Sequence, residues 1–156
     1  MTLAELKTLI QNYVENDETT FVSTLDDMIL NAEERIFELI QFDFFRKNVE
    51  GSLTAGSRFL TAPDDFVLSF SLAAIDSSGD YHYLNKKHPS FMQEYAPDPT
   101  DTSARGLPLY YGDFDKNLNT GLQESTLIIS PVPDENYDVE LHYLHKPTSL
   151  TSQTTG

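Results

Sequence analysis

The residues most suggestive of chemistry lie in one acidic stretch of the chain, DFDKNLNTGLQE. Its oxygen-bearing residues fall on positions 1, 3, 5, 7 and 12 of an EF-hand calcium loop, and they are Asp113, Asp115, Asn117, Asn119 and Glu124. Position 6, where a glycine makes the sharp turn of that loop, is Leu118, and the flanking sequences PLYY and STLIIS predict strands instead of helices. Asp and Asn also form turns readily. We therefore expect a polar hairpin loop here, with calcium binding as the weaker alternative.

Other groups of reactive residues are less specific. The four histidines, His82, His88, His142 and His145, do not follow the H-E-x-x-H spacing of a helical zinc site, so we expect them to be solvated. Adjacent carboxylates arise readily among 25 acidic residues, and Asp64-Asp65, after Pro63, is predicted to anchor a turn through side-chain to backbone hydrogen bonds. The chain has no P-loop, no G-x-S-x-G, no G-x-G-x-x-G and no cysteine. We predict that the protein is not an enzyme and needs no metal or cofactor.

Composition limits the possible partners. The 156 residues suit one domain, and a formal charge of −15 would repel the phosphates of nucleic acids and anionic membranes. No apolar run approaches the length of a membrane span, and Met1–Ile10 is not a signal peptide. The sequence therefore predicts a soluble, acidic protein made in the cytoplasm.

The N-terminal part of the chain predicts two helices that form a helical hairpin. Thr2 and Glu5 form a capping box before a first helix over residues 3–15. A second helix over residues 21–41 carries an apolar stripe with heptad-like spacing, for which helix packing or a subunit interface is predicted. The stripe consists of Leu25, Ile29, Ala32, Ile36 and Leu39. The remaining faces carry mostly acidic side chains.

The rest of the chain predicts a β-rich domain. Residues 47–54 and 58–61 are predicted to form a hairpin around Gly56. The segment VLSFSLAAID alternates Leu68, Phe70 and Leu72 on one face with Val67, Ser69 and Ser71 on the other. A short helix is predicted at 89–95. LIIS and YDVELHY are predicted to pair as a hairpin around PVPDEN, with Tyr137, Val139, Leu141 and Tyr143 on the dry face. The expected organisation is α+β: a helical region at 1–45, an antiparallel sheet or sandwich domain at 46–147 packed with it, and a flexible tail or linker at 148–156.

The order of these elements resembles the head-to-tail adaptor (connector) proteins of tailed bacteriophages, notably those of marine phages. The resemblance is carried by AEERI running into FRKN, by L-x-x-P-x-D-F at Leu60–Phe66, by G-x-P-x-Y-Y at Gly106–Tyr111, and by P-x-P-x-x-x-Y-x-V-x-L-x-Y at Pro131–Tyr143. It covers nearly the whole chain. Each motif alone is weak, and their order and spacing together are moderately specific.

The resemblance implies a structural virion protein, assembled in the host cytoplasm, that forms a ring of twelve copies below the portal protein at the head-tail interface. Such a ring extends the DNA channel without binding DNA specifically, and it provides the surface to which tail or nozzle proteins attach. It implies neither catalysis nor a cofactor nor a membrane. The resemblance also implies a C-terminal helical segment that packs on the N-terminal helices, and we expect the sequence up to Gly156 not to include it.

One alternative function remains at this point. The tyrosine-rich segments YHY and LYY could form a platform for sugar rings. The alternative is therefore a carbohydrate-binding or accessory β-module of a phage tail.

Overall fold

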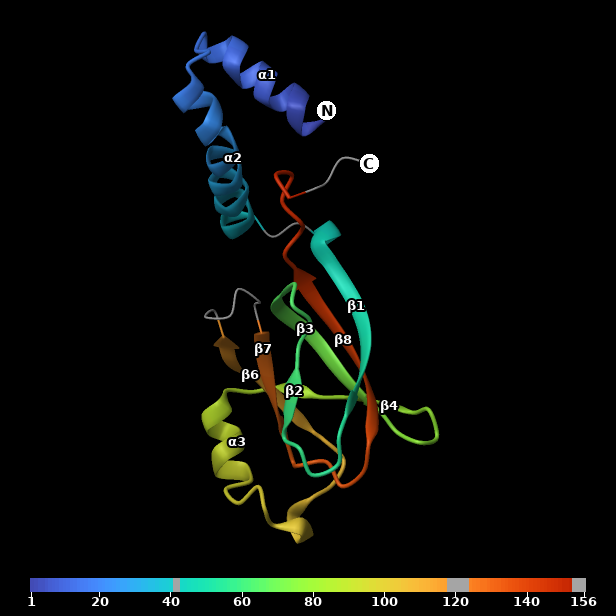
Figure 1. Ribbon diagram of the computed structural model, residues 1–156. Coiled ribbons are helices and arrows are strands. Elements are labelled where there is room, and N and C mark those ends of the chain that lie inside the picture. Colours follow the sequence, from blue (N-terminus) through green and yellow to red (C-terminus); the bar gives the residue numbers. More distant parts are fainter. Residues whose placement is uncertain (41–42, 118–123, 153–156) are drawn as a thin grey trace. The chain divides into compact units, whose positions relative to one another are not determined.

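The chain forms two compact units in the computed structural model, which describes residues 1–40, 43–117 and 124–152 (Figure 1). The first unit combines residues 1–43 with 147–156, and the second contains residues 44–146. Helices precede a sandwich-like pair of sheets, so the predicted α+β class is confirmed.

The first helix, α1 (Leu3–Val14), begins at the predicted capping box. The backbone N–H of Glu5 donates to the Thr2 hydroxyl at 3.2 Å, and the N–H of Thr2 donates to the Glu5 carboxylate at 2.7 Å. These two bonds satisfy donors that have no partner within the helix. The helix ends at Glu15, whose backbone is left-handed with φ of 54°.

The second helix, α2 (Thr19–Leu39), belongs to the same unit and is tied to α1 by an ion pair between Lys7 Nζ and Asp26, 2.6 Å long. The segment after Pro147 also contacts α2. The Ser149 hydroxyl and the backbone N–H of Leu150 both donate to the Glu33 carboxylate, at 2.6 and 3.1 Å. Polar contacts therefore join three separate stretches of sequence in this unit.

The second unit contains two four-stranded sheets. One sheet has the order β1-β8-β3-β4 and the other the order β2-β7-β6-β5. The strands are β1 (Arg46–Leu53), β2 (Phe59–Thr61), β3 (Phe66–Ile75), β4 (Tyr81–Tyr83), β5 (Asn85–Lys86), β6 (Tyr110–Asn117), β7 (Glu124–Ser130) and β8 (Tyr137–His145). A short 3-10 turn, Asp43–Phe45, precedes β1. All pairings are antiparallel except that of β5 with β6.

Two of the predicted hairpins are wrong. β1 pairs with β8 and β2 with β7, so the turn at Gly56 carries the chain from one sheet to the other. The PVPDEN segment does the same between β7 and β8. The two connections bond to each other, because the N–H of Gly56 donates to the carbonyl of Pro133 at 2.9 Å and the N–H of Ala55 to the Asn136 side chain at 2.8 Å.

The core lies between the two sheets. The dry face predicted for β8 is confirmed, since its four alternate residues from Tyr137 to Tyr143 are all buried. Simple alternation fails in β3, where irregularities in the pairing with β8 lie on either side of Leu68 and Ser69. As a result Ser69 is buried while Phe70 is exposed.

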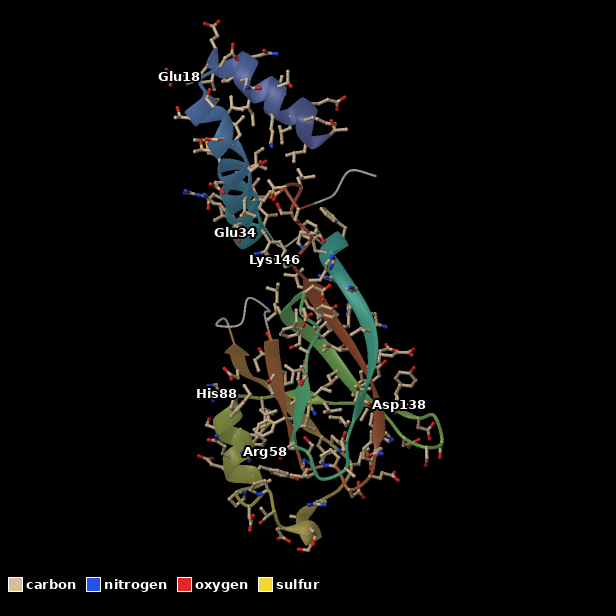
Figure 2. The ribbon with its side chains drawn as sticks, in the orientation of Figure 1. Glu18, Glu34, Arg58, His88, Asp138 and Lys146 are labelled. Carbon is tan, nitrogen blue, oxygen red and sulfur yellow. The ribbon has the colours of Figure 1, made fainter. Side chains whose placement is uncertain are left out.

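The predicted short helix is α3 (Pro89–Tyr95), with His88 as its N-cap residue and proline in its first turn. It packs against β6 and β7, and His88 is labelled at its start in Figure 2. Gly112 allows this close packing: a Cβ there would lie 2.3 Å from the Lys87 carbonyl oxygen and 2.7 Å from Met92 Cε. The outer face of the β2-β7-β6-β5 sheet is therefore partly covered.

Candidate assembly surfaces

The apolar stripe of α2 is divided along its length. Leu25 and Ile29 are buried, with 0% and 7% of their surface exposed. Ala32 is exposed, and Ile36 and Leu39 are 53% and 75% exposed. The C-terminal half of the stripe therefore presents aliphatic side chains to solvent, a feature typical of a surface that packs against another protein.

The opposite side of α2 is strongly acidic. Asp27 and Glu34 lie opposite the stripe at helical spacing, whereas Asp26 and Glu33 flank it, and Glu34 is labelled in Figure 2. Arg35 is the only basic residue in this helix sequence. The helix is thus amphipathic, with an apolar and an anionic side.

The calcium-loop candidates lie on a β-hairpin. Asp113 and Asp115 belong to β6, and Asn117 stands opposite Glu124 of β7 in the backbone register. The side chains of Asn117 and Glu124, and all of Asn119, lie outside the described residues. Lys86 Nζ forms an ion pair with the Asp113 carboxylate at 2.8 Å. Among the described residues, no group of three His, Asp or Glu side chains is arranged to hold a metal ion.

The histidines occupy four separate environments. His82 Nε2 lies 2.9 Å from the Asp76 carboxylate, and this bond, together with backbone N–H donors, lowers the pKa of Asp76. His88 Nδ1 accepts from the backbone N–H of Ser90 at 3.3 Å. His142 packs on the Phe70 ring, and His145 Nδ1 lies 2.6 Å from the Phe45 carbonyl oxygen. These contacts give the described histidines structural partners.

Asp65 forms a polar cluster that the sequence does not predict. Its carboxylate accepts a hydrogen bond from the Tyr143 hydroxyl at 2.7 Å and from Lys47 Nζ at 2.8 Å. Its backbone carbonyl accepts from the N–H of Lys146 at 2.7 Å. The side chain therefore bonds to other side chains and not to a local turn as expected, and the cluster holds the ends of β1 and β8 together.

The pKa shifts at this cluster follow from its contacts. Partial burial opposes ionisation of Asp65, but the hydrogen bonds from Lys47 and Tyr143 outweigh it and hold the pKa of Asp65 below its ordinary value. Burial and the bond to Asp65 raise the pKa of Tyr143 to about 12. Asp65 is thus an ionised acceptor at neutral pH.

The tyrosine segments do not form one platform. Tyr111 is buried, and Tyr110 packs edge-on against Phe91 and Tyr95 of α3, with ring centroids 5.0 and 5.2 Å away. Tyr81 and Tyr83 are exposed on β4 with ring centroids 6.4 Å apart.

No helix within the described ranges is long and apolar enough to span a membrane.

The chain thus combines an amphipathic helical unit, in which the α2 stripe is half exposed, with a sandwich that has its own core. The family model described as SU10 adaptor protein matches residues 1–155, and the chain belongs to this family of phage head-to-tail adaptor proteins. The family is structural, so the protein is a virion component associated with phage head and tail components. Among curated proteins, none matches this sequence.

Proposed function

We propose that the protein forms a twelve-subunit adaptor ring below the portal, extends the DNA channel and provides the surface to which tail or nozzle proteins attach. Membership of the adaptor family supports this role. The observation that supports it most directly is the exposed C-terminal half of the α2 stripe, where Ile36 and Leu39 are 53% and 75% exposed. A ring of identical subunits covers such a face with a different face of the next copy.

The charge of the protein suits a channel through which DNA passes. A formal charge of −15 gives repulsion instead of the counterion-releasing contacts that hold DNA. In this proposal either the acidic side of α2, with Asp27 and Glu34, or the end of β6, with Asp113 and Asp115, faces the channel. A ring structure with a neutral or basic channel wall would contradict this arrangement.

The test compares two substitutions on different sides of α2. Ile36→Glu places a charge in the exposed half of the stripe, whereas Leu30→Glu changes a side chain that is 36% exposed and lies away from the stripe. Both variants should remain folded, because both sites face solvent. Mixed with portal particles, the wild type and Leu30→Glu should form rings visible by negative stain and native mass spectrometry, and Ile36→Glu should not.

Two results would count against the proposal. A wild-type protein that stays monomeric on portal particles would contradict the ring. Ring formation by Ile36→Glu equal to that of Leu30→Glu would exclude the stripe as the subunit interface.

A further inference from the structure

β1 is an unusual edge strand. It has eight residues and, among the described residues, pairs only with β8, whereas the other three edge strands, β2, β4 and β5, have two or three residues. All of its residues except Val49 and Leu53 are exposed. Every second residue of such a strand directs its N–H and C=O groups away from the sheet, where another strand can bond to them.

An apolar groove opens beside this edge. It lies where β1 of one sheet faces β2 of the other, and its volume is about 230 Å³. Val49 and Leu60 form its partly exposed sides, and Val139 and Leu141 of the core line it as well. Gly51 leaves the groove open because it has no side chain. The space above it is free: a Cβ at this position would have one neighbour within 4 Å, Val139 Cγ2 at 3.5 Å.

The outer face of β1 carries an unbalanced charge. Glu50 stands directly opposite Glu140 of β8, an arrangement of like charges that destabilises a sheet. The negative charge of Glu140, with a further contribution from Glu50, disfavours ionisation of the Tyr81 hydroxyl and so raises the pKa of Tyr81. Within the described part of the chain, Lys47 on the other face of β1 bonds to Asp65 and not to Glu50. A cationic side chain placed next to Glu50 would relieve the repulsion.

We infer that the edge of β1 is a docking site for an extended strand of a partner protein. The strand adds to the sheet beside β1, places small apolar side chains in the groove opposite Val49 and Gly51, and sets a lysine or arginine opposite Glu50. Backbone hydrogen bonds supply affinity, and the groove and the charge select the partner. This site lies within the sandwich unit and does not depend on the ring or on the α2 stripe.

A synthetic peptide tests the site directly. The probe Thr-Val-Lys-Val-Thr-Val-Glu, in antiparallel orientation, puts lysine opposite Glu50, glutamate opposite Arg46 and valine opposite Gly51 and Val49. Its control exchanges the lysine and the glutamate, so that composition and net charge are the same. The probe should bind about tenfold more tightly than the control, because two charge pairs change sign. Hydrogen exchange should show new protection at residues 46–53.

Variants of the protein locate the contact. Glu50→Lys should abolish the preference between the two peptides, because each peptide then makes one attractive and one repulsive charge pair, and it changes an exposed side chain, so folding is preserved. Leu60→Arg should abolish binding by charging the groove, whereas Leu109→Arg, at a side chain 44% exposed elsewhere, should not. Thermal melting of each variant separates lost binding from lost folding.

Three outcomes would overturn the inference. They are equal affinity for the two peptides, an unchanged preference in Glu50→Lys, and β1 amides that are already protected by self-association of the free protein. The last would make a second copy the occupant. Since none of these measurements uses portal particles, failure here is distinguishable from failure of the ring.

Discussion

The two units of this chain bury their apolar residues in different ways. The sandwich unit encloses a continuous core between its sheets, with Leu72, Leu127 and Tyr143 almost inaccessible to solvent. In the helical unit, no residue of α1 is buried, and the stripe of α2 is covered only at Leu25 and Ile29. The comparison shows one unit that encloses its apolar residues in its own core and another that leaves much of its apolar stripe exposed.

The two units also differ in the density of their net charge. The helical unit has ten acidic and two basic residues among 53, a formal charge of −8, and the sandwich unit has fifteen and eight among 103, a charge of −7. The density of negative charge is thus about twice as high in the helical unit. Self-repulsion of this kind opposes compact packing, so the helical unit is expected to be the less stable of the two units on its own.

Two matched leucine substitutions, one in each unit, should differ most in their effect on the free energy of unfolding. Leu72→Ala removes a side chain that is 0% exposed in the sandwich core and should lower the free energy of unfolding by about 2–5 kcal/mol. Leu39→Ala removes one that is 75% exposed on α2 and should change it by less than about 0.5 kcal/mol in the unassembled chain. Urea unfolding measures both variants: near-UV tyrosine dichroism follows the sandwich unit, which holds seven of the eight tyrosines, and far-UV dichroism follows the helices of the other unit.

An equal loss of stability in the two variants would contradict this difference between the units. If Leu39→Ala lowered the unfolding free energy as much as Leu72→Ala, the C-terminal half of the stripe would be covered within the single chain. Far-UV dichroism of the helices, recorded in the same titration, shows in which unit the loss occurs.

A smaller effect is expected where α3 meets its sheet. Gly112→Ala places a methyl group 2.3 Å from the Lys87 carbonyl oxygen, so α3 must shift, and we expect a loss of roughly 1–3 kcal/mol. Gly106→Ala is the matched control, since a Cβ at that position would have nothing within 4 Å. Equal melting temperatures for the two variants would show that α3 is loosely held and that the sandwich unit is less rigid than its core suggests.

The sequence predicted the parts of the fold that depend on local interactions. Helix α1 was recognised from Thr2 and Glu5, and α3 from Pro89, because capping and the fixed φ of proline act within one turn. The alternation in β8 identified its buried face for the same reason. The apolar stripe of α2 was also visible, but its division into buried and exposed halves depends on what packs against it.

Strand pairing could not be predicted in the same way. A short polar turn such as that at Gly56 can return a chain within one sheet or carry it to the facing sheet, and the choice depends on residues far away in sequence. The β3 irregularities likewise appear only once β8 is its partner. The sequence predicts Asp65 as a turn residue, but its side-chain partners are 18 and 78 positions away, so no local pattern identifies the cluster.

The Asp65 cluster is expected to contribute least to the free energy of unfolding, and its contribution depends on pH. Asp65→Asn should lower the free energy of unfolding by about 1 kcal/mol at neutral pH, because the charged hydrogen bonds to Lys47 and Tyr143 are weakened. Asp64→Asn is the control, since Asp64 is the exposed neighbour. Chemical unfolding of the wild type and both variants across acidic and neutral pH measures the difference.

The sign of the pH dependence follows from the lowered pKa of Asp65. In the unfolded chain the carboxyl has its ordinary pKa of 3.8, and in the folded chain the pKa is lower. Its contribution is therefore fully present above that ordinary value and is lost as the pH falls through the folded pKa. The gap between the wild type and Asp65→Asn should be constant near neutrality and should narrow only below about pH 4. A gap that does not narrow in acid would show that Asp65 stabilises the sandwich unit by packing and not through its charge.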